Sequence, residues 1–191
     1  MKTVRLVLAG LITLAAVSTA VHLTAADDRD RDRGNRISAR LAGTNEVPVV
    51  STAASGRLKA RIASDGESID YELSFTGLQG IVAQSHIHIA QKDVNGGIVL
   101  WLCQGTSRAP ASVAALTPEC PQEGTVSGTL TAANVIPIAT QQIGPNEFNE
   151  AIDAIRAGFA YANVHTAPSP GGEIRGQLKV DDDDDHSGKG K

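Results

Sequence analysis

The stretch SGRLKARIASDGESIDYELSF, residues 55–75, indicates the fold of this 191-residue chain more clearly than any other. In 55–63 apolar residues alternate with basic ones, and from Ile69 to Phe75 every second residue is apolar or aromatic. Side chains two apart share one face of a strand, so this alternation predicts two half-buried strands. Asp65-Gly66 lies between them, and Asp-Gly favours a tight hairpin turn. The stretch therefore predicts an antiparallel hairpin with one buried face.

Similar runs continue on both sides of this hairpin. Further strands are predicted at 36–43, 81–90, 97–103, 124–131, 159–166 and 172–180. The turn-forming runs KDVNGG (92–97) and APSPGG (167–172) are expected to join successive strands. Seven to nine antiparallel strands predict an all-β fold, either a Greek-key sandwich or a barrel.

One segment departs from the strand pattern. In EFNEAIDAIRAG (147–158), Phe148, Ile152 and Ile155 recur at helical spacing. Asn146 is the expected N-cap and Gly158 the expected end. The sequence therefore predicts one short helix at about 147–157, just before the last two strands.

The two ends of the chain differ in composition from the strand-rich part. Lys2 and Arg5 precede an apolar run over 6–17 and small residues, the pattern of a secretory signal. We expect cleavage after Ala26, with a second candidate site at 18–20; the alternative is a retained N-terminal anchor. The expected organisation is a signal peptide at 1–26, a charged linker at 27–35, a β-domain at 36–180 and an acidic disordered tail at 181–191.

Export and charge limit the function classes. Loss of 1–26 removes two bases and no acid, so the formal charge falls from −4 by two units. An acidic protein lacks the basic footprint of nucleic-acid binding, which argues against such a partner. No second long apolar run follows, so no membrane span is expected in the mature protein, and the expected location is secreted or periplasmic.

Two cysteines, Cys103 and Cys120, lie 17 positions apart. An even number of cysteines in an exported chain favours a disulfide. Two free thiols or a metal-binding pair are the alternatives, although no further thiolate ligands lie nearby in the sequence.

Three of the five histidines lie in predicted strands. His86 and His88, in SHIHIA, are two apart and therefore share a face, while His165 lies in YANVHT near the end of a later strand. Imidazole is the commonest metal-donating side chain, and three imidazoles suit copper or zinc. The alternative is that these histidines only form hydrogen bonds with neighbouring groups. The sequence thus suggests a metal site whose existence depends on the fold.

Three stretches resemble the chordin-type (CHRD) domain family: LAGTNEVPVVSTAASG (41–56), SHIHIAQKDVNGGIVLWL (85–102) and YANVHTAPSPGGEIRGQL (161–178). They follow one another in the family's order and span nearly the whole expected domain. The resemblance implies a secreted or periplasmic β-domain that acts as a binding or structural module and does not imply an enzyme. Its partner is an unknown protein or polysaccharide.

The histidine pattern also looks like the copper half of Cu/Zn superoxide dismutase, a Greek-key barrel. His86 and His88 match its His-x-His strand and His165 a later ligand, and Arg175 stands roughly where that enzyme carries an anion-guiding arginine. The histidines of a zinc site and a long electrostatic loop are missing. The alternative function is therefore a dismutase-like copper enzyme.

Two further expectations concern single side chains. Trp101 lies in an apolar strand and is expected to pack in the core. Glu173 and Arg175 are two apart and are expected to form an ion pair on the surface, where such pairs contribute little to stability.

Overall fold

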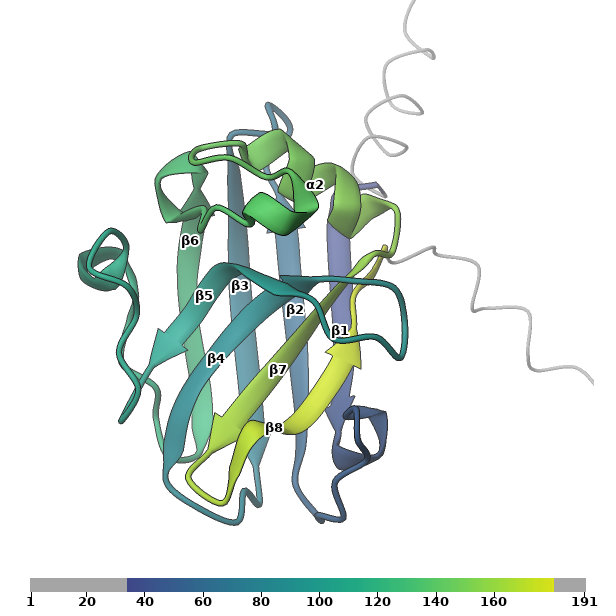
Figure 1. The fold of residues 1–191 in the computed structure, drawn as a ribbon, viewed down its shortest axis with the longest axis vertical. Helices are drawn as coiled ribbons and strands as arrows, with labels where there is room; N and C mark the ends of the chain where they lie inside the picture. The colour runs from purple at the N-terminus through teal and green to yellow at the C-terminus, as the bar shows by residue number, and fades with distance from the viewer. Residues whose placement is uncertain (1–33, 181–191) are drawn as a thin grey trace, which may run out of the picture.

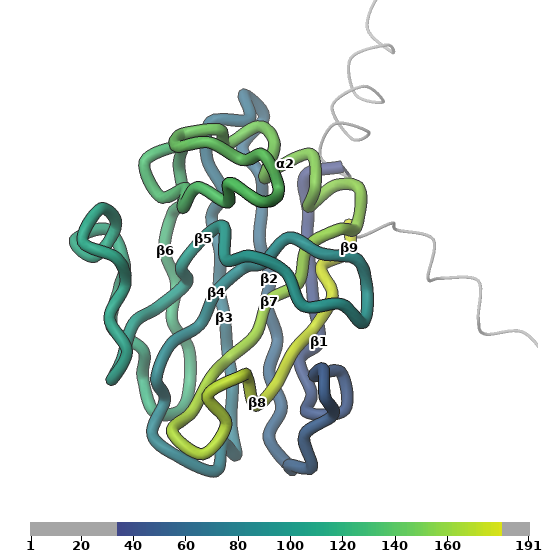
Figure 2. The backbone as a smooth tube through the Cα atoms, in the orientation of Figure 1, coloured from purple at the N-terminus to yellow at the C-terminus, as the bar shows by residue number. Residues whose placement is uncertain are grey.

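The computed structural model describes residues 34–180, which form one antiparallel sheet with a helix at one end (Figures 1 and 2). The strands are β1 (Arg36–Ala42), β2 (Ser55–Ile62), β3 (Ser68–Thr76), β4 (Val82–Ile89), β5 (Gly97–Gln104), β6 (Gly124–Thr131), β7 (Ala160–Thr166), β8 (Ser169–Gln177) and β9 (Lys179–Val180). The helix is α2 (Phe148–Arg156), and short 3-10 helices are η1 (Gly43–Asn45), η2 (Ala114–Leu116), η3 (Ala132–Asn134) and η4 (Ala139–Gln141). The expected signal peptide, most of the linker and the acidic tail lie outside the described residues.

The strand order confirms the predicted antiparallel Greek-key class. It runs β5-β4-β7-β8-β1-β2-β3-β6, with β9 paired to β1. The sheet folds over into two layers, with β5, β4, β7 and β8 in front of β6, β3, β2 and β1 (Figure 1). The chain crosses between the layers after β3, β5 and β6, and β5 and β6 approach one another at the two ends of the strand order. The result is a nearly closed barrel.

The β2–β3 hairpin has the predicted register. Leu58 of β2 lies opposite Leu73 of β3, and both side chains are fully buried between the layers. Tyr71 crosses to the other layer, because its hydroxyl donates to the carbonyl oxygen of Leu102 in β5 over 2.5 Å. Burial of one face of each layer holds the barrel together, and the basic residues of β2 lie on the outside.

The helix is confirmed, but its N-terminus differs from the prediction. Phe148, Ile152 and Ile155 are buried, and α2 begins after Glu147. Asn146 is not the cap, because it has a φ of 64° and lies one residue outside the cap position. The C-terminus follows the prediction: Gly158 has a φ of 77° and donates to the carbonyl oxygen of Ile155 over 3.0 Å.

The last hairpin also has a shorter turn than APSPGG suggested. Thr166 pairs with Ser169, so Ala167 and Pro168 alone form the turn. The Pro-Gly-Gly run continues as the start of β8, where Gly172 has a φ of 123° that suits only glycine.

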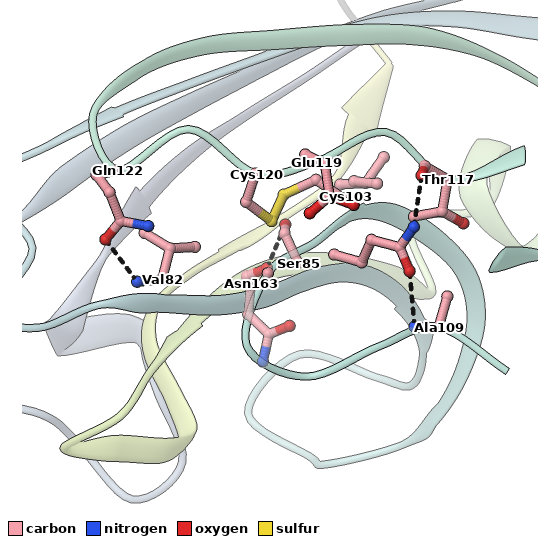
Figure 3. Close-up of a disulfide and its surroundings, with 12 residues drawn as sticks. Val82, Ser85, Cys103, Ala109, Thr117, Glu119, Cys120, Gln122 and Asn163 are labelled. Carbon is pink, nitrogen blue, oxygen red and sulfur yellow. Dashed lines mark hydrogen bonds between the residues drawn. A yellow bond between two sulfur atoms is a disulfide. The ribbon is translucent and has the colours of Figure 1, made fainter. Parts of the chain in front are cut away.

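The two cysteines form the predicted disulfide, with an S–S distance of 2.02 Å (Figure 3). It fixes the end of the 105–118 loop to β5. Gln104 holds the same loop, because its amide donates to the carbonyl oxygens of Ala114 and Thr117 over 3.0 and 2.9 Å. The disulfide and this side chain together anchor a long segment that has no strand partners of its own.

Replacing both cysteines with alanine is expected to lower the free energy of unfolding by about 3 kcal/mol, the loop-closure entropy of a ring of this size. Urea unfolding of the double variant and of the reduced wild type measures the loss. Equal stability of reduced and oxidised protein would contradict the expected contribution.

Candidate metal centre

The outer face of β4 and β7 carries a row of polar side chains. His86 lies opposite Asn163, and His88 lies opposite Tyr161. His165 follows Asn163 at the next position on the same face of β7. The residues that alternate with them, such as Ile87 and Val164, are buried in the hydrophobic core. The barrel therefore displays its histidines on the outside of the front layer.

Although it faces away from the core, this row is buried. His86 is 0% exposed, His88 7% and His165 6%. The ring of Trp101 lies edge-on to His86, with a centroid separation of 4.3 Å. Trp101 packs with Ala109 and Val113 in a small hydrophobic cluster separate from the main core, so the loop after β5 closes this side. Trp101 is buried as expected, but it packs in this separate cluster and not in the main core, and it also forms a wall of the histidine cluster.

The fold brings the three sequence-predicted histidines together. The ring centroids of His86 and His165 are 4.9 Å apart, and those of His86 and His88 5.4 Å. One ring nitrogen from each histidine lies within 4.8 Å of the others. This spacing means that small ring rotations can point three nitrogens at one ion.

Hydrogen bonds fix the tautomers of two rings. Nδ1 of His88 lies 3.0 Å from the carbonyl oxygen of Gly96, and Nδ1 of His165 lies 3.0 Å from that of Pro170. A carbonyl oxygen only accepts, so each Nδ1 carries the hydrogen and donates it. In a neutral ring the lone pair then lies on Nε2. In metal-binding histidines, the ring nitrogen that does not bind the metal usually donates its N–H to a hydrogen bond in this way, and that bond orients the ring.

Asn163 lies between these two lone pairs. Its Oδ1 is 3.1 Å from Nε2 of His88 and 3.0 Å from Nε2 of His165. Three electron-pair donors thus converge on one spot, which is stable only if a proton or a cation lies there, or if a half turn of the amide presents its NH₂ group. The side chains of Asn163, His88 and His165 therefore meet at one point, where either a hydrogen or a cation has to lie between them.

The third ring has no partner. Both ring nitrogens of His86 are buried without a hydrogen bond to any described residue. An unpaired buried polar group costs about 1–3 kcal/mol. This cost makes His86 the least satisfied side chain of the cluster, and a bound ion would satisfy its lone pair.

Burial keeps all three rings neutral. It lowers the pKa of His86 far below its ordinary value, and the neighbouring His165 and His88 lower it further. Burial lowers the pKa of His88 to about 4, although its hydrogen bonds to Gly96 and Asn163 act in the opposite direction. Burial also lowers the pKa of His165. Neutral imidazole is the form that binds metals, so the three rings could hold an ion at neutral pH.

A buried carboxyl group lies on the far side of Asn163. Glu46 is 5% exposed and its Oε1 has no hydrogen-bond partner among the described residues. Burial raises its pKa to about 7, while the nearby Arg175 acts to lower it. Gly172 leaves room for the Glu46 side chain beside Asn163, because a Cβ at position 172 would collide with the Glu46 carboxyl and the Asn163 amide.

The expected surface ion pair between Glu173 and Arg175 is wrong. Glu173 is 0% exposed and accepts from the hydroxyls of Thr52 and Thr166 over 2.8 and 2.6 Å. Arg175 is 2% exposed and donates to Asn95 Oδ1 over 3.0 Å and to the carbonyl oxygen of Val94 over 2.7 Å. Loops cover the face they share, so the two side chains bind separate partners.

Arg175 is connected to the histidine cluster through Tyr161. Its guanidinium carbon lies 3.4 Å from the centre of the Tyr161 ring, and the other neighbour of that ring is His88, stacked at 4.6 Å. β7 lies between β4 and β8, so the tyrosine separates the arginine from the histidine. The guanidinium is therefore held near the cluster but does not touch the three rings.

Sequence reasoning missed three residues of this region. Tyr161 and Asn163 precede His165 by four and two positions, so strand alternation alone would have placed them on the histidine face. No local signal marks Glu46, because it reaches the site from the loop after η1.

The geometry defines a class: a β-barrel module with a buried cluster of three histidines outside its core. The family model for the CHRD domain matches residues 37–178. The chain belongs to the CHRD domain family. No curated protein and no solved structure matches it, and the likeness to Cu/Zn superoxide dismutase is not borne out. Within residues 34–180 the structure has no helix that is long and apolar enough to cross a membrane.

Proposed function

We propose that this chain is an exported CHRD-domain module that binds one copper or zinc ion through His86, His88 and His165. The observation that supports it most is His86, whose two ring nitrogens are buried without a partner beside two other imidazoles. Three nitrogen ligands fit the preferences of both metals. When bound, the ion would link β4 to β7 and so stabilise the barrel wall.

Asn163 is the natural fourth ligand. In a tetrahedral site with metal–ligand bonds of about 2.0 Å, neighbouring ligand atoms lie about 3.3 Å apart. Oδ1 lies 3.0 and 3.1 Å from the two Nε2 atoms, which is close to this ligand–ligand distance. His86 has to move nearer by a ring rotation to complete the shell.

The burial of the cluster favours a binding or structural role over catalysis. A catalytic metal keeps an open position for substrate, whereas structural sites are closed. With exposures of 0–7%, the three rings leave little access for a substrate. The disulfide supports export, because such bonds persist in oxidising compartments.

Metal titration of chelator-treated, untagged protein tests the proposal. We expect one equivalent of Cu²⁺ or Zn²⁺ to bind, with nitrogen hyperfine structure in the copper EPR spectrum. His165→Ala should weaken binding by about 100-fold, since one ligand of the shell is lost. His186→Ala is the matched control and should bind like the wild type. Equal metal content and affinity in His86→Ala, His165→Ala and wild type would overturn the proposal.

A further inference from the structure

A polar cavity lies on the other side of Arg175 from the histidine cluster. It has a volume of about 410 Å³, and its lining comes from β1, η1, the 92–93 turn, β8 and β9. Four bases line it, Arg40, Lys92, Arg175 and Lys179, against one acid, Asp93. The whole chain has a formal net charge of −4, so this concentration of positive charge is a local feature.

The sheet register next to the cavity adds to this charge. Arg40 of β1 lies directly opposite Arg57 of β2. Like charges at opposed positions destabilise a sheet. On the other side of Arg57 the neighbour in β3 is Ser74, which brings no compensating charge. A bound anion would offset this repulsion.

Arg175 gives the cavity a fixed cation. Its guanidinium is held by Asn95, by the carbonyl oxygen of Val94 and by the Tyr161 ring. A guanidinium has five N–H hydrogens, and these two hydrogen bonds to described residues use two of them. The 91–96 loop, which reaches over to β8 (Figure 2), thus holds a buried cation in a fixed place at the wall of the cavity before any ligand arrives.

The rest of the lining is neutral: Ala39 is apolar, and Ser38, Asn45 and Gln177 add hydroxyl and amide groups. The amide nitrogens of Asn45 and Gln177 donate to the carbonyl oxygens of Arg175 and Gly158 over 3.0 and 2.7 Å, so these two side chains would present their oxygens as acceptors. A volume of about 410 Å³ is far larger than a lone oxyanion and lies in the range of small-molecule sites. We propose that this cavity binds a sugar unit carrying a sulfate or phosphate ester, with the bases on the ester and the neutral groups on the sugar hydroxyls.

Titration of the full-length, chelator-treated protein at low ionic strength tests this site, with affinity followed by calorimetry and two-dimensional NMR. The probes are glucose 6-sulfate, glucose 6-phosphate, inorganic sulfate, inorganic phosphate and glucose. We expect both sugar esters to bind at least about tenfold more tightly than the free ions or glucose. Chemical shift changes should centre on Ser38, Lys92 and Gln177.

A double substitution of two exposed lysines that line the cavity tests their part in ester binding. Lys92→Ala/Lys179→Ala should weaken ester binding by about tenfold without affecting the fold, since neither side chain is buried. Arg108→Ala is the matched control: Arg108 is exposed, pairs with Glu119 in a distant loop and should leave binding unchanged. His165→Ala should also leave it unchanged, which separates this site from the metal proposal. Equal affinities for inorganic sulfate and glucose 6-sulfate, or full ester binding by the double lysine variant, would overturn the inference.

Discussion

Replacing Glu173 with alanine should lower the free energy of unfolding by about 4 kcal/mol, because its buried carboxyl satisfies three donors at once. The hydroxyl of Thr52 and the backbone N–H of Gln79 donate to Oε1 over 2.8 and 2.9 Å. The hydroxyl of Thr166 donates to Oε2 over 2.6 Å. These donors belong to β7 and to the loops before β2 and before β4, so one side chain joins three parts of the chain.

Urea unfolding measures this effect against two variants. Glu173→Gln should lose about half as much stability as Glu173→Ala. The amide keeps one oxygen that accepts hydrogen bonds, but its NH₂ group faces donors that it cannot pair with. Glu72→Ala removes the same kind of side chain from the exposed face of β3 and should change stability by less than about 0.5 kcal/mol. A Glu173→Ala loss as small as that of Glu72→Ala would contradict the role assigned to the buried carboxyl.

The contrast between Glu173 and the β2–β3 hairpin shows what the sequence could predict. In the hairpin, alternation alone places Leu58 and Leu73 on one face, and the structure buries both. The same rule correctly puts Glu173 and Arg175 on a common face of β8. It does not show whether loops cover that face, and this determines whether the pair lies at the surface or in a buried hydrogen-bonding network.

For the histidine cluster, too, the sequence predicts one part of the arrangement and not the other. The i, i+2 spacing of His86 and His88 predicts a shared face, and their approach to His165 requires β4 and β7 to be neighbours. That pairing depends on the order of the strands in the sheet, which neither residue periodicity nor the number of strands determines. Glu46 and the Gly96 carbonyl enter from loops without any periodic pattern, so no strand argument could have located them.

Acidification from pH 6.5 to 4.5 should lower the free energy of unfolding of the metal-free protein by about 4 kcal/mol. The three buried histidines have lowered pKa values, so below about pH 6.5 the unfolded chain takes up more protons at these residues than the folded chain does, up to three. Stability from this source is complete above pH 6.5 and is lost as the pH falls.

Glu46 acts in the opposite direction. Its pKa rises from 4.5 to about 7 on folding, so between these values the folded protein holds one proton more than the unfolded chain. The net difference near pH 5.5 is therefore at most about two protons, and stability should fall by up to about 2.5 kcal/mol per pH unit. Glu46→Gln removes the opposing contribution, so its slope should steepen toward three protons.

Urea unfolding of chelator-treated wild type and Glu46→Gln at several pH values from 8 to 4.5 measures both slopes. His186→Ala controls for the loss of a histidine that is not one of the three proposed ligands and should follow the wild-type curve. Saturating Zn²⁺ should raise the profile by a nearly constant amount above about pH 5, because the folded rings are already neutral there and the ion displaces no proton from them. A wild-type stability that stays constant down to pH 4.5 would show that the three rings are not buried in neutral form.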